Sequence, residues 1–461
     1  MKFEMVAKTF MGLEGVLSDE LTALGADNVQ QGNRMVSFTG DKELLYRANF
    51  QCRTALRILK PIFKFTSTDA EDLYNKVLEL DWSNVMNADS TFAINATVYS
   101  DLFRHSRFVT YRVKDAIADY FVKREGHRPS IRLNAPDRTF DVHISGNDVT
   151  ISLDSSGEPL YKRGWRTAQT DAPINEVLAA GILKLAGWDG TTDLIDPMCG
   201  SGTFLIEAAL IAANINPGVY RQDFAFQHWD DYDAELFDAI FNDDSDEREV
   251  TCKIQGYDIM AKAVAISELN IKNAGLGKYI TVERRALEDW TEAPAGATLV
   301  TNPPYGERLV VGDIQGLYRT LGEKIKRVFR GYHAWVICPD DKELYTNIGL
   351  RASVHYPLLN GELQCELREY VSFDGSYNEM RSRGDDIKNR DFRASERAPR
   401  HRRADDERRP RRDRDFDSDD ERPKRPTPRS FHGPTLSTDA ERPIIHGRRN
   451  GWKRRDLDNE K

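Results

Sequence analysis

The sequence predicts an α/β protein: a Rossmann-like domain with a mostly parallel sheet, preceded by smaller α+β units and followed by a disordered, charged tail. Between residues 161 and 371, short apolar runs alternate with stretches of helical periodicity, which is typical of a parallel sheet. The first 65 residues follow a β-α-β-β-α-β order, which indicates a ferredoxin-like unit. From about residue 379, large apolar residues are too rare to offset chain entropy.

The composition bounds the kind of protein. A chain of 461 residues is expected to form two or three domains, and a hydrophobic fraction of 40% suffices for real cores. Its five cysteines are scattered without C-x-x-C spacing, which predicts a reducing cytoplasm, no disulfide framework and no zinc site. Neither a membrane-length apolar run nor a signal-peptide pattern is present, so we expect a cytoplasmic protein without a membrane partner.

Charge is distributed unevenly along the chain. From Arg381 onward there are 25 Lys and Arg against 18 Asp and Glu, a net +7, whereas the whole chain is −9 and the preceding body is therefore −16. The acidic body argues against a nucleic-acid partner, and the basic tail argues for one. Two interpretations of the tail remain open: a flexible arm that contacts RNA, or a solubilising segment.

The N-terminal half divides into two predicted units. The first, 1–65, is expected to contain a strand at 3–9, a helix at 12–24, a hairpin at 28–38, a helix at 41–49 and a strand at 55–65. The second, 66–157, is expected to contain helices at 69–80 and 108–123, a strand at 91–98, and a hairpin of 140–145 with 148–153.

The most basic stretch of the body surrounds the helix expected at 108–123. The candidate RNA-binding residues there are Arg104, Arg107, Arg112, Lys114, Lys123 and Arg124. Such a cluster either contacts RNA phosphates or forms an ordinary solvated helix face, and its density favours RNA.

The third predicted domain, 158–378, carries the alternating pattern. We expect helices at 174–186, 203–213, 261–274 and 317–329, and strands at 192–195, 253–257, 280–283, 298–300 and 333–337. Two further strands, near 352–356 and 364–371, are expected to close the sheet, with one of them antiparallel. The tail occupies 379–461.

The turn from Asp196 to Thr203 joins the first strand of this domain to a helix. Its glycines permit close backbone approach, and the helix start presents free N–H groups, at the sheet edge where ligands bind. The turn matches neither a phosphate loop nor G-x-G-x-x-G, so S-adenosylmethionine suits it better than ATP or NAD. The candidate cofactor-binding residues here are Asp196, Met198, Cys199, Gly200, Gly202 and Thr203.

The next two strand ends carry acids. Asp258, followed by Ile259, ends the second strand and is placed to accept both ribose hydroxyls, although Asp also caps helices well. After the third strand, Glu288 or Asp289 is the candidate for the adenine amine, and either could instead belong to a solvated loop. We take Glu288 as the candidate.

The tetrad Asn302-Pro303-Pro304-Tyr305 follows the fourth strand. The prolines stiffen the loop and leave carbonyls free, so the Asn302 side chain and the Pro303 carbonyl can together accept two hydrogens of one exocyclic amine. The Tyr305 ring can stack on the flat base that carries this amine. The sequence therefore predicts chemistry on an amino group of a planar heterocycle, with Asn302, Pro303 and Tyr305 as catalytic candidates and Asn302 also close to the cofactor.

These motifs, in this order, resemble class I S-adenosylmethionine-dependent methyltransferases of the amino-methylating type. The string 301–309, continuing Gly306-Glu307-Arg308-Leu309, and Ala172-Pro173-Ile174-Asn175-Glu176 narrow the resemblance to bacterial 23S ribosomal RNA (guanine-N2)-methyltransferases that carry a THUMP domain. In this resemblance residues 66–157 are the THUMP domain, and residues 161–166 form the junction between the N-terminal units and the α/β domain. Some relatives carry a second methyltransferase domain, whereas here the charged tail follows, so we expect one methyltransferase activity. The chain also has Arg285 where relatives often place an acid, which leaves the adenine contact open.

The resemblance implies methylation of a guanine N2 amine in ribosomal RNA, either as naked RNA or in a large-subunit precursor particle. Neither a metal nor an enzyme nucleophile is expected, and Cys199 is not expected to be catalytic. Three alternatives remain at this stage: adenine-N6 methylation of RNA or DNA, protein glutamine methylation, and a non-catalytic RNA-binding assembly factor. The tetrad alone accepts an adenine as readily as a guanine.

Overall fold

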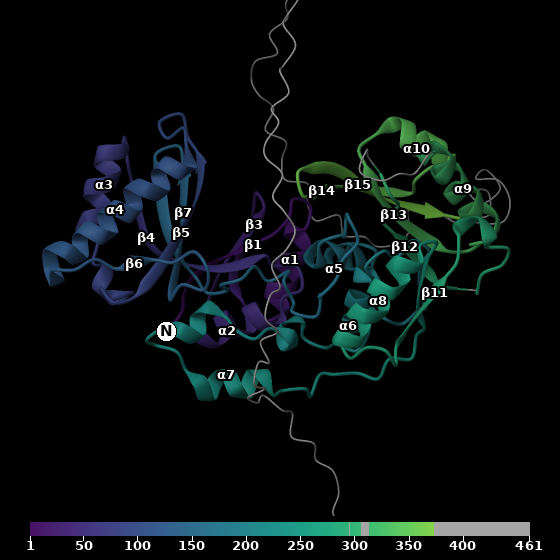
Figure 1. Cartoon of the computed structure of the whole chain (residues 1–461), viewed down its shortest axis with the longest axis horizontal. Helices are drawn as coiled ribbons and strands as arrows, with labels where there is room; N and C mark the ends of the chain where they lie inside the picture. Colours follow the sequence, from purple (N-terminus) through teal and green to yellow (C-terminus); the bar gives the residue numbers. More distant parts are fainter. Residues whose placement is uncertain (295, 306–312, 373–461) are drawn as a thin grey trace, which may run out of the picture. The chain divides into compact units, whose positions relative to one another are not determined.

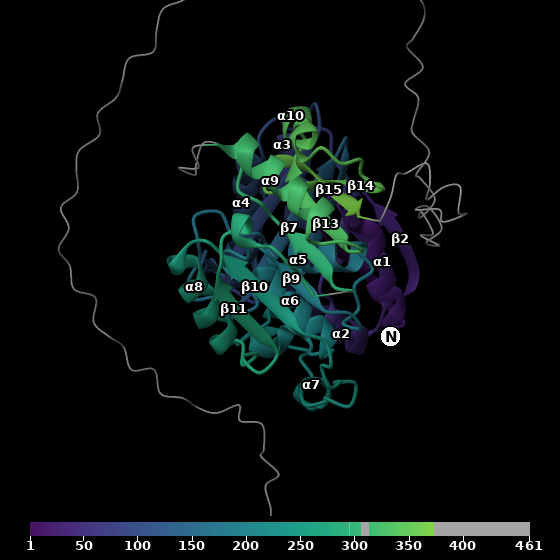
Figure 2. The same cartoon turned by 90° about the vertical axis from the view of Figure 1, so that its right-hand side faces the viewer.

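The computed structural model describes residues 1–294, 296–305 and 313–372. Two mixed sheets organise this part of the chain, one formed by the N-terminal half and one by the C-terminal half (Figures 1 and 2). The motif residues Gly306-Glu307-Arg308-Leu309 and the tail at 379–461 lie outside the described residues.

The first sheet has eight strands in the order β2-β3-β1-β4-β8-β7-β5-β6. The strands are β1 (Phe3–Lys8), β2 (Asp27–Gly32), β3 (Met35–Gly40), β4 (Arg57–Thr66), β5 (Thr91–Tyr99), β6 (Ser130–Ile131), β7 (Arg138–Ser145) and β8 (Asp148–Asp154). The helices of this half are α1 (Glu14–Ala23), α2 (Lys42–Gln51), α3 (Ala70–Glu79) and α4 (Ser106–Glu125), with a 3-10 turn at Trp82–Asn84.

The two N-terminal units share one continuous sheet. The sequence predicts them as separate units, but β4 pairs antiparallel with β8 from Leu59↔Asp154 to Thr66↔Asp148. The long β4 strand makes this possible, because its first residues pair with β1 and its later ones extend along β8.

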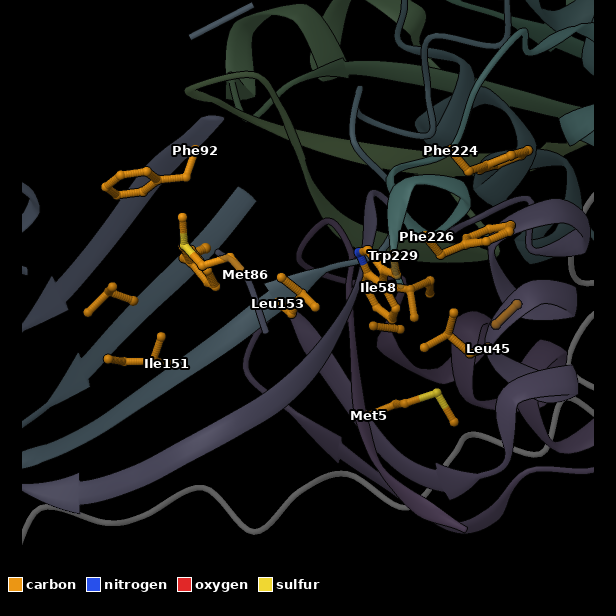
Figure 3. Close-up of a cluster of buried hydrophobic side chains, with 14 of the residues drawn as sticks. Met5, Leu45, Ile58, Met86, Phe92, Ile151, Leu153, Phe224, Phe226 and Trp229 are labelled. Carbon is orange, nitrogen blue, oxygen red and sulfur yellow. The ribbon is translucent and has the colours of Figure 1, made fainter. Parts of the chain in front are cut away.

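The hydrophobic core of this half includes aromatic residues from the C-terminal half of the chain. Phe224, Phe226 and Trp229 are buried in the same cluster as Met5, Leu45 and Ile58 (Figure 3). The ring centroids of Phe226 and Tyr46, on α2, lie 4.3 Å apart in a stacked arrangement. Stacked aromatic pairs of this kind add about 0.5–1.5 kcal/mol beyond their buried area. The segment after α6 therefore helps to fix the N-terminal half.

The second sheet has seven strands in the order β11-β10-β9-β12-β13-β15-β14. The strands are β9 (Leu194–Asp196), β10 (Ile254–Asp258), β11 (Ile280–Arg284), β12 (Thr298–Thr301), β13 (His333–Pro339), β14 (Val354–Asn360) and β15 (Leu363–Val371). The helices are α5 (Glu176–Leu185), α6 (Thr203–Ala212), α7 (Ala234–Phe241), α8 (Ala261–Asn273), α9 (Ile314–Arg327) and α10 (Lys342–Ile348); 3-10 turns lie at Pro217–Tyr220, Ala225–His228 and Leu287–Asp289.

Helices cover both faces of this sheet (Figure 1). Side chains of α5, α6 and α8 are buried in one apolar cluster, and side chains of α9 and α10 in another. The five strands β9 to β13 pair in parallel, and β15 pairs antiparallel with both neighbours. The expected α/β sheet with one antiparallel late strand is thus confirmed. Within the described residues, no helix combines the length and apolar character needed to cross a membrane.

Candidate active site

Strand order brings the predicted site residues to one edge of the second sheet. The central strand β9 pairs in parallel with β10 on one side and β12 on the other. Asp196 ends β9, Asp258 ends β10, and Asn302 follows β12. Because parallel strands end at the same edge of a sheet, the three residues surround one crevice, where open α/β sheets bind ligands.

A cavity of about 550 Å³ lies at this edge, within the range of cofactor sites. The predicted residues that line it are Met198, Gly200, Asp258, Ile259, Glu288, Asn302, Pro303 and Tyr305. Ala172, which carries part of the family resemblance, and Arg285, which departs from it, also line the cavity, and other lining residues were not singled out from the sequence: Thr170, Asp171, Lys262, Asp313, Leu317 and Thr320.

The turn after β9 is built for close packing. Gly200 and Gly202 have φ of +54° and +77°, a region that favours glycine. Gly256 on β10 faces the same turn, since a Cβ there would lie 2.3 Å from Leu205 and 3.2 Å from the Cys199 sulfur. The buried Asp196 carboxylate accepts the Met198 N–H at 3.1 Å, and burial raises its pKa to about 7. Asp196 therefore supports the turn from beneath.

Asp258 connects two elements through its carboxylate. One oxygen accepts the Gly200 N–H at 3.0 Å and the other accepts the Met260 N–H at 2.9 Å. Burial raises the pKa of this group, against the effect of the two backbone hydrogen bonds. The helix α8 begins after Met260, so Asp258 holds the chain just before the helix and stays on the cavity wall. Each carboxylate oxygen retains a lone pair for a further donor.

Asn270 of α8 and Ser201 of the turn after β9 brace the segment at 167–170 beside the cavity. The Asn270 amide donates to the carbonyls of Ala168 and Ser201, and its oxygen accepts the Ala168 N–H. The Ser201 hydroxyl accepts the Thr170 N–H at 2.9 Å. This bracing explains why Thr170 to Ala172 line the cavity. The only sequence signal nearby is Ala172-Pro173 before α5, because a residue preceding proline is extended.

The end of β11 carries a cation. The Arg285 guanidinium lies over the rings of Tyr257 and Trp290, 4.8 and 4.7 Å from their centroids, and pairs with Glu283 at 3.2 Å. Glu288 lines the cavity, whereas Asp289 is not among the described lining residues. The structure thus favours Glu288 over Asp289 as the acid on this wall.

The tetrad forms the opposite wall. The Asn302 Oδ1 atom is buried and has no hydrogen-bond partner among the described residues. Burial raises the pKa of the Tyr305 hydroxyl to about 12, and this hydroxyl accepts the Asn360 amide at 2.6 Å. A buried acceptor without a donor costs about 1–3 kcal/mol, so Asn302 is suited to a ligand that brings a donor.

Four predicted cofactor residues do not line the cavity: Asp196, Cys199, Gly202 and Thr203. They lie beneath it instead. The Cys199 sulfur is 3.7 Å from the Ser267 hydroxyl, and burial raises the pKa of its thiol well above the usual value. A thiol with a raised pKa, such as that of Cys199, is a poor nucleophile at neutral pH. Thr203 accepts a hydrogen bond from Arg166 at 2.8 Å.

The candidate RNA-binding residues on and before α4 differ in their surroundings. Arg104, Arg107, Lys123 and Arg124 are exposed. Arg112 donates to Glu71 at 2.6 Å and lies over the Tyr74 ring, which ties α4 to α3. Lys114 pairs with Asp115 at 2.8 Å. Arg107 and Arg124 each donate to a tyrosine hydroxyl one turn away, of Tyr111 at 3.3 Å and of Tyr120 at 3.0 Å. The four exposed cations are the ones placed to reach a phosphate.

Three family models match the chain. A ferredoxin-like domain model, named for RlmL, matches residues 4–59, and a THUMP domain model matches residues 67–154. An RMKL-like methyltransferase domain model matches residues 163–369, which contain the cavity. The expected fold class and the expected methyltransferase motifs agree with these three matches.

The matches to curated relatives cover more than three quarters of the chain. Ribosomal RNA large subunit methyltransferase K/L of Syntrophotalea carbinolica is 42% identical over 373 residues, which cover 78% of this chain and 52% of the relative. "Putative RNA methyltransferase slr0064" of Synechocystis is 37% identical over 362 residues, covering 78% of this chain and 94% of the relative. The chain spans about half the length of the K/L relatives that it matches.

Solved structures agree with this assignment. SMU.472, described as a "putative methyltransferase complexed with SAH", is 29% identical with a TM-score of 0.72, and the match covers 81% of this chain and 99% of that one. A predicted N6-adenine-specific DNA methylase from Listeria monocytogenes is 30% identical with a TM-score of 0.72, covering 81% and 97%. Since SAH is demethylated S-adenosylmethionine, these findings indicate S-adenosylmethionine as the cofactor. The chain belongs to the family of THUMP-domain methyltransferases with an RMKL-like catalytic domain.

Proposed function

We propose that this protein methylates the exocyclic N2 amine of a guanine in 23S ribosomal RNA, with S-adenosylmethionine as the methyl donor. The observation that carries the proposal is the buried Asn302 Oδ1, which lies on the cavity wall without a hydrogen-bond partner among the described residues. A guanine amine brings the donor that this atom lacks. The relatives named as ribosomal RNA large subunit methyltransferases support the choice of RNA.

The residues of the tetrad orient the amine of the base toward the methyl donor. Asn302 Oδ1 and the Pro303 carbonyl accept the two amine hydrogens, which turns the nitrogen lone pair away from the ring and toward the donor methyl. Tyr305 stacks on the extruded base. The cofactor, when bound, supplies the methyl group: a nitrogen–carbon bond forms, the sulfur–carbon bond breaks with its electron pair remaining on sulfur, and one amine proton leaves to water. Orientation of this kind is worth about 7–11 kcal/mol in well-placed systems.

The cavity residues fit this cofactor. Asp258 offers two oxygens for the ribose hydroxyls, and the apolar side chains of Ile259 and Leu287 offer surface for the adenine. Glu288 is placed to accept the adenine amine. Gly200 lets the backbone approach, and Met198 lies beside it on the same wall. Asp196, Cys199, Gly202 and Thr203 support the turn from below without touching the ligand.

The N-terminal half would bring the RNA. We assign residues 1–65 to the ferredoxin-like domain, 66–157 to the THUMP domain, 158–378 to the catalytic domain and 379–461 to a charged tail. Arg104, Arg107, Lys123 and Arg124 are exposed and would contact phosphates, whereas Arg112 and Lys114 are partly held by ion pairs with neighbouring side chains. Under this proposal the substrate is ribosomal RNA, either naked or in a precursor particle, and the protein is located in the cytoplasm.

Adenine-N6 methylation is the second candidate. The solved structure from Listeria monocytogenes is named as a predicted N6-adenine-specific DNA methylase, and the Asn302 and Pro303 acceptors suit an adenine amine equally well. Nucleoside mass spectrometry of large-subunit RNA and of DNA, each treated with the enzyme, separates the two candidates: N2-methylguanosine supports the proposal, and N6-methyladenine supports the alternative. Methylated glutamine in a ribosomal protein would instead indicate a protein substrate.

The direct test of the mechanism is Asn302→Ala. Removing this acceptor is expected to lower turnover by a factor of 100 or more, on the order of 3 kcal/mol, because the amine loses its orienting partner. Binding of SAH, measured by calorimetry, is expected to change less than about threefold. Asn347→Ala, on α10, is the matched control, since the Asn347 amide donates to the Glu343 carbonyl of its own helix and Asn347 is not among the described residues that line the cavity. Full turnover by Asn302→Ala would refute the mechanism, and a non-catalytic assembly factor would show no turnover even as wild type.

A further inference from the structure

The Tyr305 side chain is fixed at both ends. Its backbone continues the Pro303-Pro304 pair, where two rings restrict the main chain. Its hydroxyl, at the other end, accepts the Asn360 amide at 2.6 Å. The two residues are 55 positions apart in the chain, so only tertiary packing brings them together.

Asn360 is itself held rigidly, at the end of β14. It pairs with Leu363 across the tight turn of the β14–β15 hairpin, in which Gly361 has φ of +65°. A glycine with positive φ at the first central position is typical of a two-residue type II′ turn, which matches the twist of the strands. Two positions from Asn360, Leu358 is fully buried.

Two residues in the middle of β14, Pro357 and Leu358, lie against the N-terminal half. A Cβ on Gly12, in the loop before α1, would lie 2.5 Å from the Pro357 carbonyl oxygen and 2.8 Å from the Leu358 side chain. Such a close approach is open only to glycine. The strand that carries Asn360 is therefore clamped between β15 and the ferredoxin-like half of the chain.

We propose that Asn360 is a positioning residue for the methyl acceptor, acting through the Tyr305 hydroxyl; this inference rests on the proposed function. The Asn360 amide fixes the ring of Tyr305 before the base arrives, so that the base meets a preformed stacking surface. The ordering of the aromatic side chain is then already complete in the free enzyme. Tyr305 lines the cavity with Asn302 and Pro303, so a fixed ring also fixes where the amine lies relative to its acceptors.

The test compares Asn360→Ala, Tyr305→Phe and the double variant. Each single change removes one partner of a neutral hydrogen bond, and kcat on RNA at saturating cofactor is expected to fall about 3- to 10-fold. The Kd of SAH is expected to stay unchanged. In the Tyr305→Phe background, Asn360→Ala is expected to change kcat less than about twofold, because the shared bond is already absent. Gln364→Ala, an exposed position on the same hairpin, is the control and keeps wild-type kcat.

A spectroscopic measurement decides the inference without depending on activity. In protein labelled with 3-fluorotyrosine, the fluorine resonance missing from Tyr305→Phe belongs to Tyr305. Asn360→Ala is expected to shift and narrow this resonance as the ring becomes mobile, and Gln364→Ala to leave it unchanged. Two results would overturn the inference. One is an unchanged Tyr305 resonance in Asn360→Ala, and the other is a double variant whose loss of kcat equals the product of the fold losses of the two single variants. Wild-type protein that methylates no RNA would overturn the proposed function instead, while the fluorine spectrum still reports on Asn360.

Discussion

The contact between Asp258 and the cofactor ribose gives the sharpest quantitative prediction. Its two carboxylate oxygens already accept the N–H groups of Gly200 and Met260, at 3.0 and 2.9 Å, and each retains a lone pair on the cavity side. Hydrogen bonds to a charged group contribute about 1.5–3 kcal/mol each. Two such bonds with imperfect additivity give about 3 kcal/mol, so Asp258→Ala is expected to raise the Kd of SAH on the order of 100-fold.

The same substitution also unpairs two backbone N–H groups, and that effect must be separated from the ribose contact. Calorimetry with SAH and with an analogue that lacks one ribose hydroxyl makes the separation. Wild-type protein is expected to bind the deoxy analogue about 10- to 100-fold more weakly than SAH. Asp258→Ala is expected to bind the two ligands with similar affinity, because the partner of the missing hydroxyl is gone.

The outcome that refutes the reasoning is an equal penalty in both proteins. If the deoxy analogue loses the same affinity against wild type and Asp258→Ala, the carboxylate does not contact the ribose. Asp258 would then act only on the turn, through Gly200 and Met260.

Three further predictions follow. Burial raises the pKa of Asp196 to about 7, so the folded protein favours the protonated carboxyl, and this contribution to stability is lost as pH rises from about 4 toward 7. Asp196→Asn is therefore expected to remove up to about 4 kcal/mol of the change in unfolding free energy between pH 4 and 8, measured by urea unfolding. Gly256→Ala would place a Cβ 2.3 Å from Leu205, and a loss of about 1–3 kcal/mol should appear as a lower melting temperature. Lys123→Ala is expected to weaken RNA binding and reduce its logarithmic salt slope by about 0.7–0.9, whereas Arg112→Ala, which breaks the pair with Glu71, should mainly lower stability.

The sequence predicts the residues that carry the chemistry of this site better than the other residues that line its cavity. Asp196, Asp258 and Asn302 each follow a short apolar run, and the ends of parallel strands meet at one edge, so their proximity follows from local patterns alone. Thr170, Asp171 and Asp313 also line the cavity, but they come from segments that only tertiary packing brings there. No periodicity in the sequence marks such positions.

The same distinction explains which elements and pairings of the fold were not predicted. The short helices α7 and α10 have 8 and 7 residues, too few for a clear helical pattern, and β6 has only 2. Pairing of β4 with β8 joins the two N-terminal units, and its register shifts between Pro61 and Phe63, which local propensity does not encode. Asn360 was also missed. An Asn-Gly pair predicts a hairpin with both residues at the centre of the turn, whereas here Gly361 and Glu362 form the turn and Asn360 ends β14.

Buried charges link the N-terminal half to the catalytic sheet. Arg163 and Glu207 are almost fully buried, with 3.3 Å between the guanidinium and the carboxylate, and Arg163 also donates to the Arg53 carbonyl at 2.6 Å. Arg53 in turn donates to the carbonyls of Leu210 and Ile215, which flank the end of α6. A buried ion pair gains little net stability over apolar packing, but its geometry is demanding. We therefore interpret the network as a device that specifies one arrangement of Arg53 and Arg163 against α6, the helix whose first residue closes the cofactor turn.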